Sequence, residues 1–395
     1  MVHFCPSYFR FRGSMKILTV DVGTGTQDIF LYDSRLDLEN GFKLVLPSPT
    51  MIVRGEVRQA TLKREAILLT GVTMGGGPSH WAVEDHLRAG LPVYALPEAA
   101  RSFNDDLDLV AEMGVEIVNE DEAGRLPKGI KRIEFRDFDF RSIQGAFEKF
   151  GVTLKDLSAV AVAVFDHGNA PPGYSDRQFR FDYLDARIRA ENRLSAFAYL
   201  APDVPPIMTR LRAVVRSAPL LDAPLVVMDT APAAVLGATL DPRVGSQGRV
   251  IVVNVGNFHT LAFRVGPGGI EGVFEHHTGL IDLTRLEELL IALADGSLKH
   301  GDVFDDNGHG ALIYEERPLD LEKSEFGVAV TGPRRNLMRG SKLRPYFAVP
   351  FGDMMIAGCF GMLAAVADLV PELSEPVRAS LLGAGGSGTP PWEAA

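Results

Sequence analysis

The sequence contains very little cysteine. Only two cysteines occur among 395 residues, Cys5 and Cys359, and they lie near opposite ends of the chain. Two distant cysteines cannot build a disulfide framework, and no closely spaced group exists to hold zinc or an iron–sulfur cluster. A protein of the reducing cytoplasm is therefore expected.

Long hydrophobic runs and an excess of positive charge are also missing. The longest apolar run, residues 354–367, is too short to cross a bilayer and contains two glycines, so it predicts a buried helix. The chain has 40 Lys and Arg against 51 Asp and Glu, a net charge of −11. This balance argues against nucleic acid or an anionic membrane as the main partner, and leaves a small molecule or another protein.

What the chain does contain is enough residues for two cores. Its length and its 46% hydrophobic content predict an N-terminal lobe at 15–228, with an inserted α/β segment, and a C-terminal lobe at 229–383. Residues 1–14 lack the pattern of a secretory signal, and we interpret them as an extension before a functional start at Met15. Residues 384–395 have the Gly- and Pro-rich composition of a flexible tail.

Two segments far apart in the chain share one pattern. Residues 17–26 and 250–257 each consist of an apolar, β-branched run that ends in Asp or Asn and is followed by a Gly-containing turn. A second apolar stretch returns after each turn, at 29–32 and 260–265, so both segments predict hairpins. Glycine lets backbone N–H groups approach an anion closely. The repetition therefore indicates two phosphate-binding hairpins and a nucleotide held between two related domains.

The rest of the chain alternates between short apolar runs and amphipathic stretches. This alternation is typical of an α/β protein with largely buried sheets. Strands are expected at 66–69, 92–96, 115–118, 159–165 and 224–228, and helices at 81–88, 107–113, 142–150, 184–200 and 207–215. A further helix is expected to open at Asp229 and Thr230, either of which suits its N-cap, with Pro232 in the first turn.

The order of these motifs resembles the superfamily of actin, the heat-shock chaperone ATPases and the sugar kinases. Residues 21–26 and 254–260 resemble its two phosphate motifs, and 328–333 its adenosine motif. Residues 229–240 and 353–365 resemble its two connecting helices. The loop and helix at 276–292 also look like those that follow the second hairpin in chaperone members. The resemblance implies a two-lobed, ribonuclease H-like fold with ATP and Mg²⁺ in the cleft between the lobes.

Within this superfamily the chain is similar to a domain family named after pyruvate formate-lyase activating enzymes. The similarity lies in residues 70–78, in Glu98 to Ala100 with Asp105 and Asp106, and in residues 166–169. A true activating enzyme is a radical enzyme that binds an iron–sulfur cluster through three closely spaced cysteines. Two distant cysteines cannot do this, so we treat the family label as a name and not as an activity.

The superfamily resemblance also implies roles for particular residues in phosphoryl transfer. Asp21 would orient Mg²⁺, with Asn254 as a second metal-facing residue. The residues implied in nucleotide binding are Gly23, Thr24, Gly25, Thr26, Gly256, Asn257, Gly332 and Pro333.

Asp229 matches the position of the carboxylate that accepts the proton of the substrate hydroxyl in sugar kinases. The alternative is that Asp229 only caps its helix. Asp166 is a further catalytic candidate, because it follows an apolar strand. The residues expected to face the substrate are His167, Asn169, Gly75, Gly76 and Gly77.

Three positions depart from the superfamily pattern. Asn254 replaces the usual Asp of the second hairpin and removes a charge that would help to hold the metal. Gln27 and Asp28 stand where many kinases place a basic residue. Pro333 stands where a second Gly usually approaches adenine, and either Arg334 or Arg335 compensates or both are simply solvated.

Several His and Asp residues are of the type that binds transition metals. They are Asp166, His167, His259, His276, His277, Asp305 and His309. No pair has the helical spacing of a metal site, so solvated or buried structural histidines are favoured. Asp166 and His167 are kept as substrate-facing.

Two functions of different classes remain open at this point. The first is a kinase of a small polar metabolite, which predicts a deep polar pocket formed by residues 71–77 and 166–169. The second is a chaperone-like or reactivating ATPase that acts on a partner protein, which predicts an exposed apolar patch. A degenerate site that binds another nucleotide or none is a third alternative.

Overall fold

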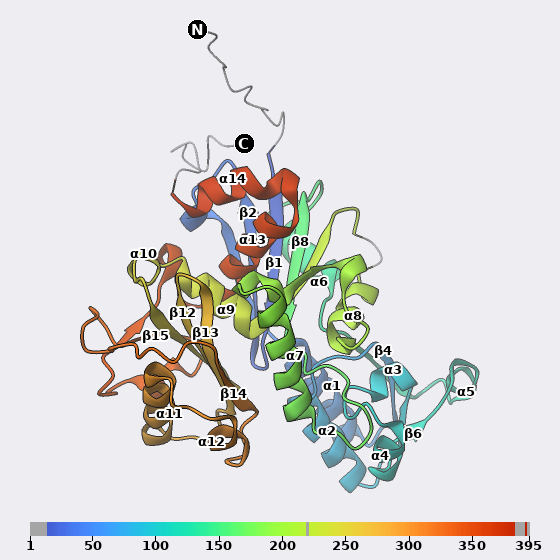
Figure 1. Ribbon diagram of the computed structural model, residues 1–395. Helices are drawn as coiled ribbons and strands as arrows, with labels where there is room; N and C mark the ends of the chain where they lie inside the picture. The colour runs from blue at the N-terminus through green and yellow to red at the C-terminus, as the bar shows by residue number, and fades with distance from the viewer. Residues whose placement is uncertain (1–13, 219–220, 384–391, 393–395) are drawn as a thin grey trace.

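The computed structural model describes residues 14–218, 221–383 and 392, and Figure 1 shows its arrangement. The proposed extension before Met15 and the proposed C-terminal tail lie almost entirely outside the described residues. Met15 itself is buried, and its backbone N–H donates to Ser34 Oγ at 3.0 Å. None of the described helices is both long and apolar enough to cross a membrane.

The first sheet has six strands. Their order is β3-β2-β1-β8-β10-β9, with bounds β3 Phe42–Pro47, β2 Thr26–Asp33, β1 Lys16–Val22, β8 Ala159–Val164, β10 Leu225–Asp229 and β9 Ala198–Leu200. β1, β2 and β3 form an antiparallel meander, whereas β1, β8 and β10 are parallel. The all-buried sequence of β8, alternating Ala and Val, suits a central strand that is covered on both faces.

The second sheet repeats this plan. Its order is β14-β13-β12-β11-β15-β16, with bounds β14 Gly310–Ile313, β13 Gly269–His277, β12 His259–Gly266, β11 Val250–Val255, β15 Val328–Thr331 and β16 Pro345–Phe347. The meander β11, β12 and β13 corresponds to β1, β2 and β3, and the parallel strands β15 and β16 correspond to β8 and β10. This internal repeat is the two-lobed actin-like architecture expected from the two similar hairpins.

Helices cover both faces of each large sheet (Figure 1). α13 (Ala357–Leu369) packs on one face of the first sheet, and α6 (Phe140–Lys149) and α8 (Thr209–Arg216) pack on the other. The second sheet is covered by α9 (Thr230–Thr239) and α7 (Asp176–Ala190) on one face and by α11 (Leu283–Asp295) on the other. The expected buried helix at 354–367 is therefore α13, although it begins three residues later.

Helices on each side of residue 229 in the sequence pack against the sheet formed mainly by the other side. α7 precedes this residue but contributes to the core of the second sheet. α13 and α14 (Pro371–Leu381) follow it but pack beside the first sheet, where Tyr32 Oη lies 2.8 Å from Ser380 Oγ. The lobe boundary at 228/229 stays a prediction, since the two lobes exchange helices.

A third, smaller sheet belongs to the inserted segment. Its strands are all parallel, in the order β6 Glu116–Ile117, β5 Val93–Ala95, β4 Ile67–Gly71 and β7 Lys131–Phe135. The helices around it are α1 Pro49–Lys63, α2 Pro78–Arg88, α3 Pro97–Ala100, α4 Leu107–Glu112 and α5 Glu120–Arg125. This unit occupies the lower right of Figure 1, with its own apolar core.

Among the expected elements, the helix at 184–200 differs most from the structure. The helix expected at 184–200 ends at Ala190, and the chain then forms a short 3-10 turn and β9. α7 also begins at Asp176, where the Ser175 side chain caps it, because Ser175 Oγ accepts from the Gln178 N–H. The apolar residues at 194–200 belong to this 3-10 turn and to the edge strand β9. The sequence pattern did not distinguish them from a continuation of the helix.

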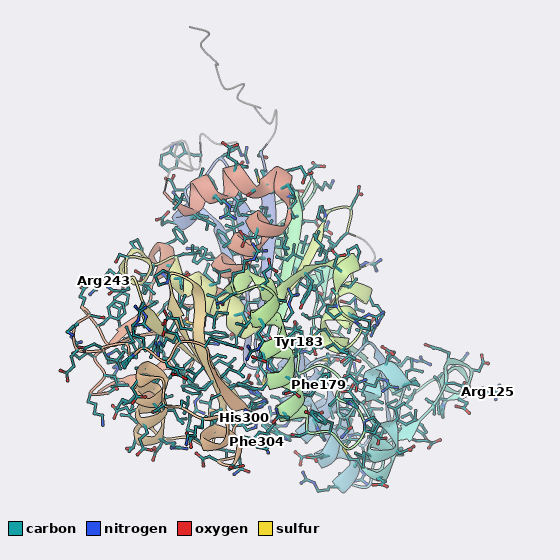
Figure 2. All side chains as sticks on the ribbon, in the orientation of Figure 1. Arg125, Phe179, Tyr183, Arg243, His300 and Phe304 are labelled. Atoms are coloured by element: carbon teal, nitrogen blue, oxygen red, sulfur yellow. The ribbon has the colours of Figure 1, made fainter. Side chains whose placement is uncertain are left out.

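α7 also contacts the far end of the second lobe. Arg177 Nη1 donates to the Phe304 carbonyl at 3.0 Å, and the Arg177 guanidinium lies 4.3 Å from the centre of the Phe304 ring. Phe304 and His300 belong to α12 (His300–Phe304) and are labelled near Phe179 of α7 in Figure 2. α7 thus contacts α12 as well as the second sheet.

Candidate functional site

The two hairpin turns have the same geometry. The Gly23 N–H donates to the Thr26 carbonyl, and the Gly256 N–H donates to the His259 carbonyl, both at 2.9 Å. The turns also lie against each other, because a Cβ added at Gly25 would come within 3.0 Å of Asn257 Nδ2. The repeated sequence pattern therefore produces two facing loops at one place.

These loops border a large cavity of about 1100 Å³. Nearly every residue expected to bind nucleotide or substrate lines it. Those residues are Gly23, Thr24, Thr26, Gly256, Asn257, Gly332, Pro333, Gly75, Gly76, Gly77, His167 and Asn169, together with Asp21, Asp166 and Asn254. Gly25 and Asp229 are the two expected residues that are not part of the lining.

Hydrogen bonds from the start of α1 connect the first hairpin to the glycine turn. Ser48 Oγ donates to the Thr24 carbonyl and Thr50 Oγ1 donates to the Gly76 carbonyl, each at 2.6 Å. Gly77 has a φ of +66°, and a Cβ added there would lie 2.5 Å from the Phe258 ring of the second hairpin. Residues 75–77 therefore form a third wall, placed tightly against both loops.

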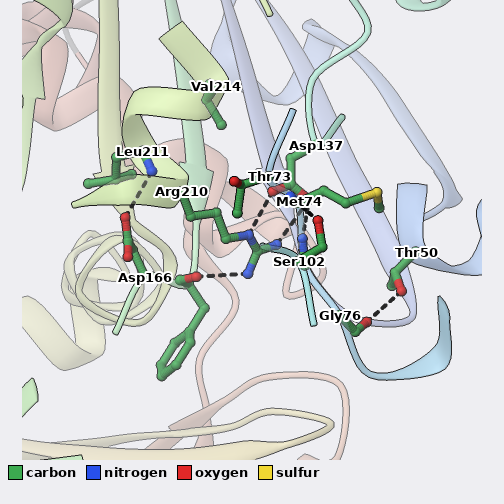
Figure 3. A network of polar contacts seen from close by, with 12 residues as sticks. Thr50, Thr73, Met74, Gly76, Ser102, Asp137, Asp166, Arg210, Leu211 and Val214 are labelled. Atoms are coloured by element: carbon green, nitrogen blue, oxygen red, sulfur yellow. Dashed lines mark hydrogen bonds and ion pairs between the residues drawn. The ribbon is translucent and has the colours of Figure 1, made fainter. Parts of the chain in front are cut away.

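The Asp166 carboxylate lines the cavity and is held in place by two backbone N–H groups. Its Oδ1 accepts from the Gly168 N–H and its Oδ2 from the Leu211 N–H, both at 2.9 Å. Burial raises the pKa of Asp166 to about 6. Arg210 joins this region to the glycine turn, since its Nε donates to Asp137 Oδ2 at 2.6 Å and its Nη1 to the Phe165 carbonyl at 2.7 Å (Figure 3). Asp137 Oδ1 in turn accepts from the Gly75 N–H at 3.2 Å.

Asp229 caps α9 and is engaged by an arginine. Its Oδ1 accepts from the Ala231 N–H at 3.2 Å, and its Oδ2 accepts from Arg180 Nη1. The Asp229 side chain therefore caps α9, and its role toward a substrate stays a prediction. Arg180 is fully buried and its Nε also donates to Glu275 Oε2 at 2.9 Å. Both Asp229 oxygens thus accept hydrogen bonds, and Asp229 is not part of the cavity lining, whereas the adjacent Thr230 and Ala231 are.

Asp21 has an acidic neighbour that sequence reasoning missed. Asp21 is the register partner of Asp28 in the β1–β2 hairpin, and both line the cavity. Burial is the main cause that raises the pKa of Asp21 to about 6 and that of Asp28 to about 7, and the charge of Asp21 raises the latter further. Asp28 Oδ1 is buried without a hydrogen-bond partner among the described residues. Two adjacent carboxylates with an unsatisfied oxygen fit a hard divalent cation such as Mg²⁺.

The other sites singled out in the sequence are placed as follows. Asn254 Oδ1 lies beside Gly332, where an added Cβ would come within 2.5 Å of it. Arg335 lines the cavity and its Nη1 donates to the Gly332 carbonyl at 2.9 Å, whereas Arg334 is exposed and is not part of the lining. Of the His and Asp set, His167, His259 and His309 lie together, and the His277 ring is 4.8 Å from that of His309.

The sequence did not identify three residues of this site: Arg180, Glu275 and Asp28. The register of the first hairpin was the one usable signal, because a turn at 23–26 pairs residue 21 with residue 28. Arg180 and Glu275 meet only through the packing of α7 on the second sheet, and no local pattern indicates it.

Comparison with solved structures gives similarities of low score. A ROK hexokinase from Thermus thermophilus is 14% identical, with a TM-score of 0.24, over 94% of this chain and 87% of that one. An exopolyphosphatase-like protein is 11% identical, with a TM-score of 0.24, over 93% and 90% of the two chains. A ROK family transcriptional regulator is 8% identical, with a TM-score of 0.22; the match covers 65% of this chain and only 38% of that protein. The fold assignment therefore depends on the strand order described above. No curated protein matches the chain in sequence.

A family profile does match the chain in sequence. It covers residues 74–337, which is more than half of the chain, and its description is "Putative pyruvate format-lyase activating enzyme (DUF1786)". The two cysteines of the sequence are too few for the cluster that the label would require. This chain is a member of the DUF1786 family with an actin-like fold.

Proposed function

We propose that this protein is a phosphotransferase that uses ATP and Mg²⁺ to phosphorylate a small polar metabolite. The observation that carries this proposal is the single cavity shared by both hairpin turns, the glycine turn at 75–77 and the segment 166–169. Its volume of about 1100 Å³ exceeds the roughly 300–1,000 Å³ that one small ligand usually needs. The cavity therefore has room for a nucleotide and a second small molecule.

The nucleotide end of the cavity is assigned to the two hairpins. Thr24, Thr26, Gly256 and Asn257 would hold the phosphates from opposite lobes through hydroxyl, amide and backbone groups. Arg335, beside Gly332, would contact the nucleoside side of the ligand.

Asp21 and Asp28 would hold Mg²⁺ largely through water, since this ion gives up its hydration reluctantly. The bound ion would neutralise charge on the transferred phosphoryl group. Thr230 Oγ1 donates to Asp21 Oδ1 at 2.6 Å, which fixes the orientation of this carboxylate. Asn254 remains a proposed neighbour of the metal from the second lobe.

The substrate end is assigned to residues 75–77, His167 and Asn169. Asp166 positions this end through its two backbone hydrogen bonds. Asp229 is assigned to holding Arg180 and capping α9, in place of the general-base role that the superfamily resemblance implied. Phosphoryl transfer proceeds mainly by positioning and charge neutralisation, so the proposal does not need a strong base.

The test has two stages. The first measures the melting temperature with ATP, ADP and Mg²⁺, because a ligand of the folded state raises it by mass action. The second measures ADP release with pools of sugars, polyols and small carboxylic acids, with Asp21→Asn as the control. Absence of ATP binding at millimolar concentration would refute the proposal. ATP hydrolysis without transfer to any small molecule would instead favour an ATPase that acts on a partner protein.

A further inference from the structure

Three histidines from distant parts of the chain meet beside the cavity. His167 follows β8 of the first sheet, His259 begins β12 and His309 directly precedes β14. Their ligating nitrogen atoms all lie within 4.8 Å of one another. His167 and His259 line the cavity, whereas His309 is 1% exposed and lies behind the lining. One face of the cluster therefore opens to the cavity.

His309 has no hydrogen-bond partner that accounts for its burial. Neither its Nδ1 nor its Nε2 is bonded to any of the described residues. Glu275 Oε1 is 3.7 Å from His309 Nδ1, beyond hydrogen-bond distance. Buried polar atoms are nearly always satisfied in folded proteins, so two unsatisfied nitrogens on one buried ring indicate a missing ligand.

Glu275 determines which nitrogen of His259 is free. Glu275 is fully buried and forms an ion pair with the Arg180 guanidinium, whose Nε lies 2.9 Å from Glu275 Oε2. An ionised carboxylate only accepts hydrogen bonds, so His259 Nδ1, at 2.8 Å from Glu275 Oε1, must carry the proton. The lone pair of His259 is then on Nε2. A carboxylate that orients a histidine in this way is typical of metal-binding histidines.

The charges around the cluster favour a cation. The Glu275 carboxylate, beside both His259 and His309, supplies negative charge at the cluster. The buried Arg180 guanidinium beside Glu275 is paired with two carboxylates, Glu275 and Asp229.

We propose that His167, His259 and His309 form a binding site for one divalent transition metal, with Zn²⁺ as the best fit. Three imidazole nitrogens suit zinc, whereas Mg²⁺ prefers oxygen ligands. The fourth coordination position opens to the cavity and takes a water molecule or an oxygen atom of a bound substrate. This site is separate from the carboxylate pair Asp21 and Asp28, and the inference does not depend on the phosphotransferase proposal.

The test uses the full-length chain without a polyhistidine tag, stripped with a chelator and titrated calorimetrically with Zn²⁺. We expect one equivalent of Zn²⁺ to bind. His167→Gln and His309→Gln should each lower the affinity at least about tenfold, because even second-shell partners of a metal contribute ten- to a hundredfold. Co²⁺ in place of Zn²⁺ should give visible absorption typical of a tetrahedral site, and the same two variants should lose it.

Two control variants locate the metal. His80→Gln changes a histidine that lines the same cavity but is outside the cluster, and it should bind Zn²⁺ like the wild type. Asp28→Asn should also leave Zn²⁺ affinity unchanged, which separates this site from the proposed magnesium site. If Asp28→Asn abolishes Zn²⁺ binding, the ion occupies the carboxylate pair and the inference is wrong.

Folding of the variants is checked by melting in the presence of chelator. His309→Gln should melt close to the wild type under these conditions, because the His309 ring makes no hydrogen bond that the change would remove. If this variant unfolds, His167→Gln, at a more accessible position, decides the matter. Failure of the wild type to bind Zn²⁺, or equal affinity in the wild type and His167→Gln, would overturn the inference.

Discussion

Asp21 lies directly opposite Asp28 across the β1–β2 hairpin, and each carboxyl retains its proton at a higher pH than an ordinary Asp. The pKa of Asp21 is about 6 and that of Asp28 about 7, against an ordinary value of 3.8. If Mg²⁺ binds between the two carboxylates, the metal neutralises their negative charge and takes the place of the protons. This relationship leads to the first prediction.

Without metal, the pair should destabilise the fold as the pH rises from about 4 to about 7. Over that range the unfolded chain loses protons that the folded chain retains, so the free energy of unfolding falls. The double variant Asp21→Asn, Asp28→Asn removes both groups and should gain stability relative to the wild type above pH 6. Melting curves in chelator at pH 5 and pH 8 measure this difference.

Adding Mg²⁺ should reverse the trend for the wild type alone. The stabilisation by Mg²⁺ should be small at pH 5 and increase through pH 6 to 7, as the metal replaces the two protons. An equal effect of Mg²⁺ at both pH values, or an effect that the double variant retains, would contradict the assignment of the metal to this pair.

Gly358 keeps Asp21 in place by lacking a side chain. A Cβ at residue 358 would lie 1.9 Å from Asp21 Oδ2. Gly358→Ala should displace the carboxylate and lower the Mg²⁺-dependent affinity for ATP roughly tenfold, the equivalent of about 1.4 kcal/mol. Crowding in the packed interior should also cost about 1–3 kcal/mol of stability.

Gly145→Ala is the matched control for this change. Gly145 also lies in a helix, α6, but a Cβ there would meet no atom within 4 Å. This variant should bind ATP normally and gain about 0.5–1 kcal/mol of stability. If both variants bind ATP equally well, Asp21 does not act in nucleotide binding as proposed.

Gly256→Val tests the second hairpin. A Cβ at residue 256 would lie 2.6 Å from the His259 carbonyl, so the turn would have to change shape. Affinity for both ATP and ADP should fall about ten- to a hundredfold, whether or not Mg²⁺ is present. Gly268→Val, at the other end of β12, adds the same side chain where no atom lies within 4 Å. Calorimetric titration of the two variants should differ; equal losses would mean that the effect is not local to the phosphate loop.

Asp229→Asn separates positioning from proton transfer. Asn caps a helix about as well as Asp, so the cap should survive, but Arg180 would lose one of its two ionised partners. We expect a loss of about 1.5–3 kcal/mol of stability, and a fall in turnover of less than tenfold. A fall of 10²–10⁴ with normal ATP affinity would show that Asp229 takes the substrate proton after all.

Glu275→Gln provides the comparison, because it removes the other ionised partner of Arg180. If Asp229 acts through Arg180, the two variants should have similar effects on turnover. Steady-state kinetics of both variants, measured below their melting temperatures, decide between the two roles.

The sequence was most informative where short segments act on their own. The two hairpins, the cap of α9 and the buried helix α13 each depend on a few consecutive residues, and all four appear in the structure. The order of these segments was enough to identify the fold and to predict many of the residues that line the cavity. Even the match of residue 21 with residue 28 could have been derived from the hairpin register.

Contacts between distant segments were not predictable in this way. Arg180 and Glu275 are ninety-five positions apart, and their ion pair forms only because α7 packs on the second sheet. The histidine cluster has the same origin, since its members lie at the ends of three different strands or next to them. Judged one at a time in the sequence, these histidines were interpreted as solvated or structural, although the fold brings three of them together. The helix expected at 184–200 was wrong in its second half because a short edge strand has too few residues to show a period of two.

The crossing of α9 and α13 has a consequence for motion between the lobes. A Cβ at Gly237 would lie 1.7 Å from the Ala357 carbonyl, and one at Gly361 would lie 1.9 Å from the Ala233 carbonyl. Two backbones this close cannot slide past each other without collision, but they can rotate about their contact point. Any rotation of one lobe against the other should therefore pivot at this glycine contact, and its amplitude should grow with distance from the crossing.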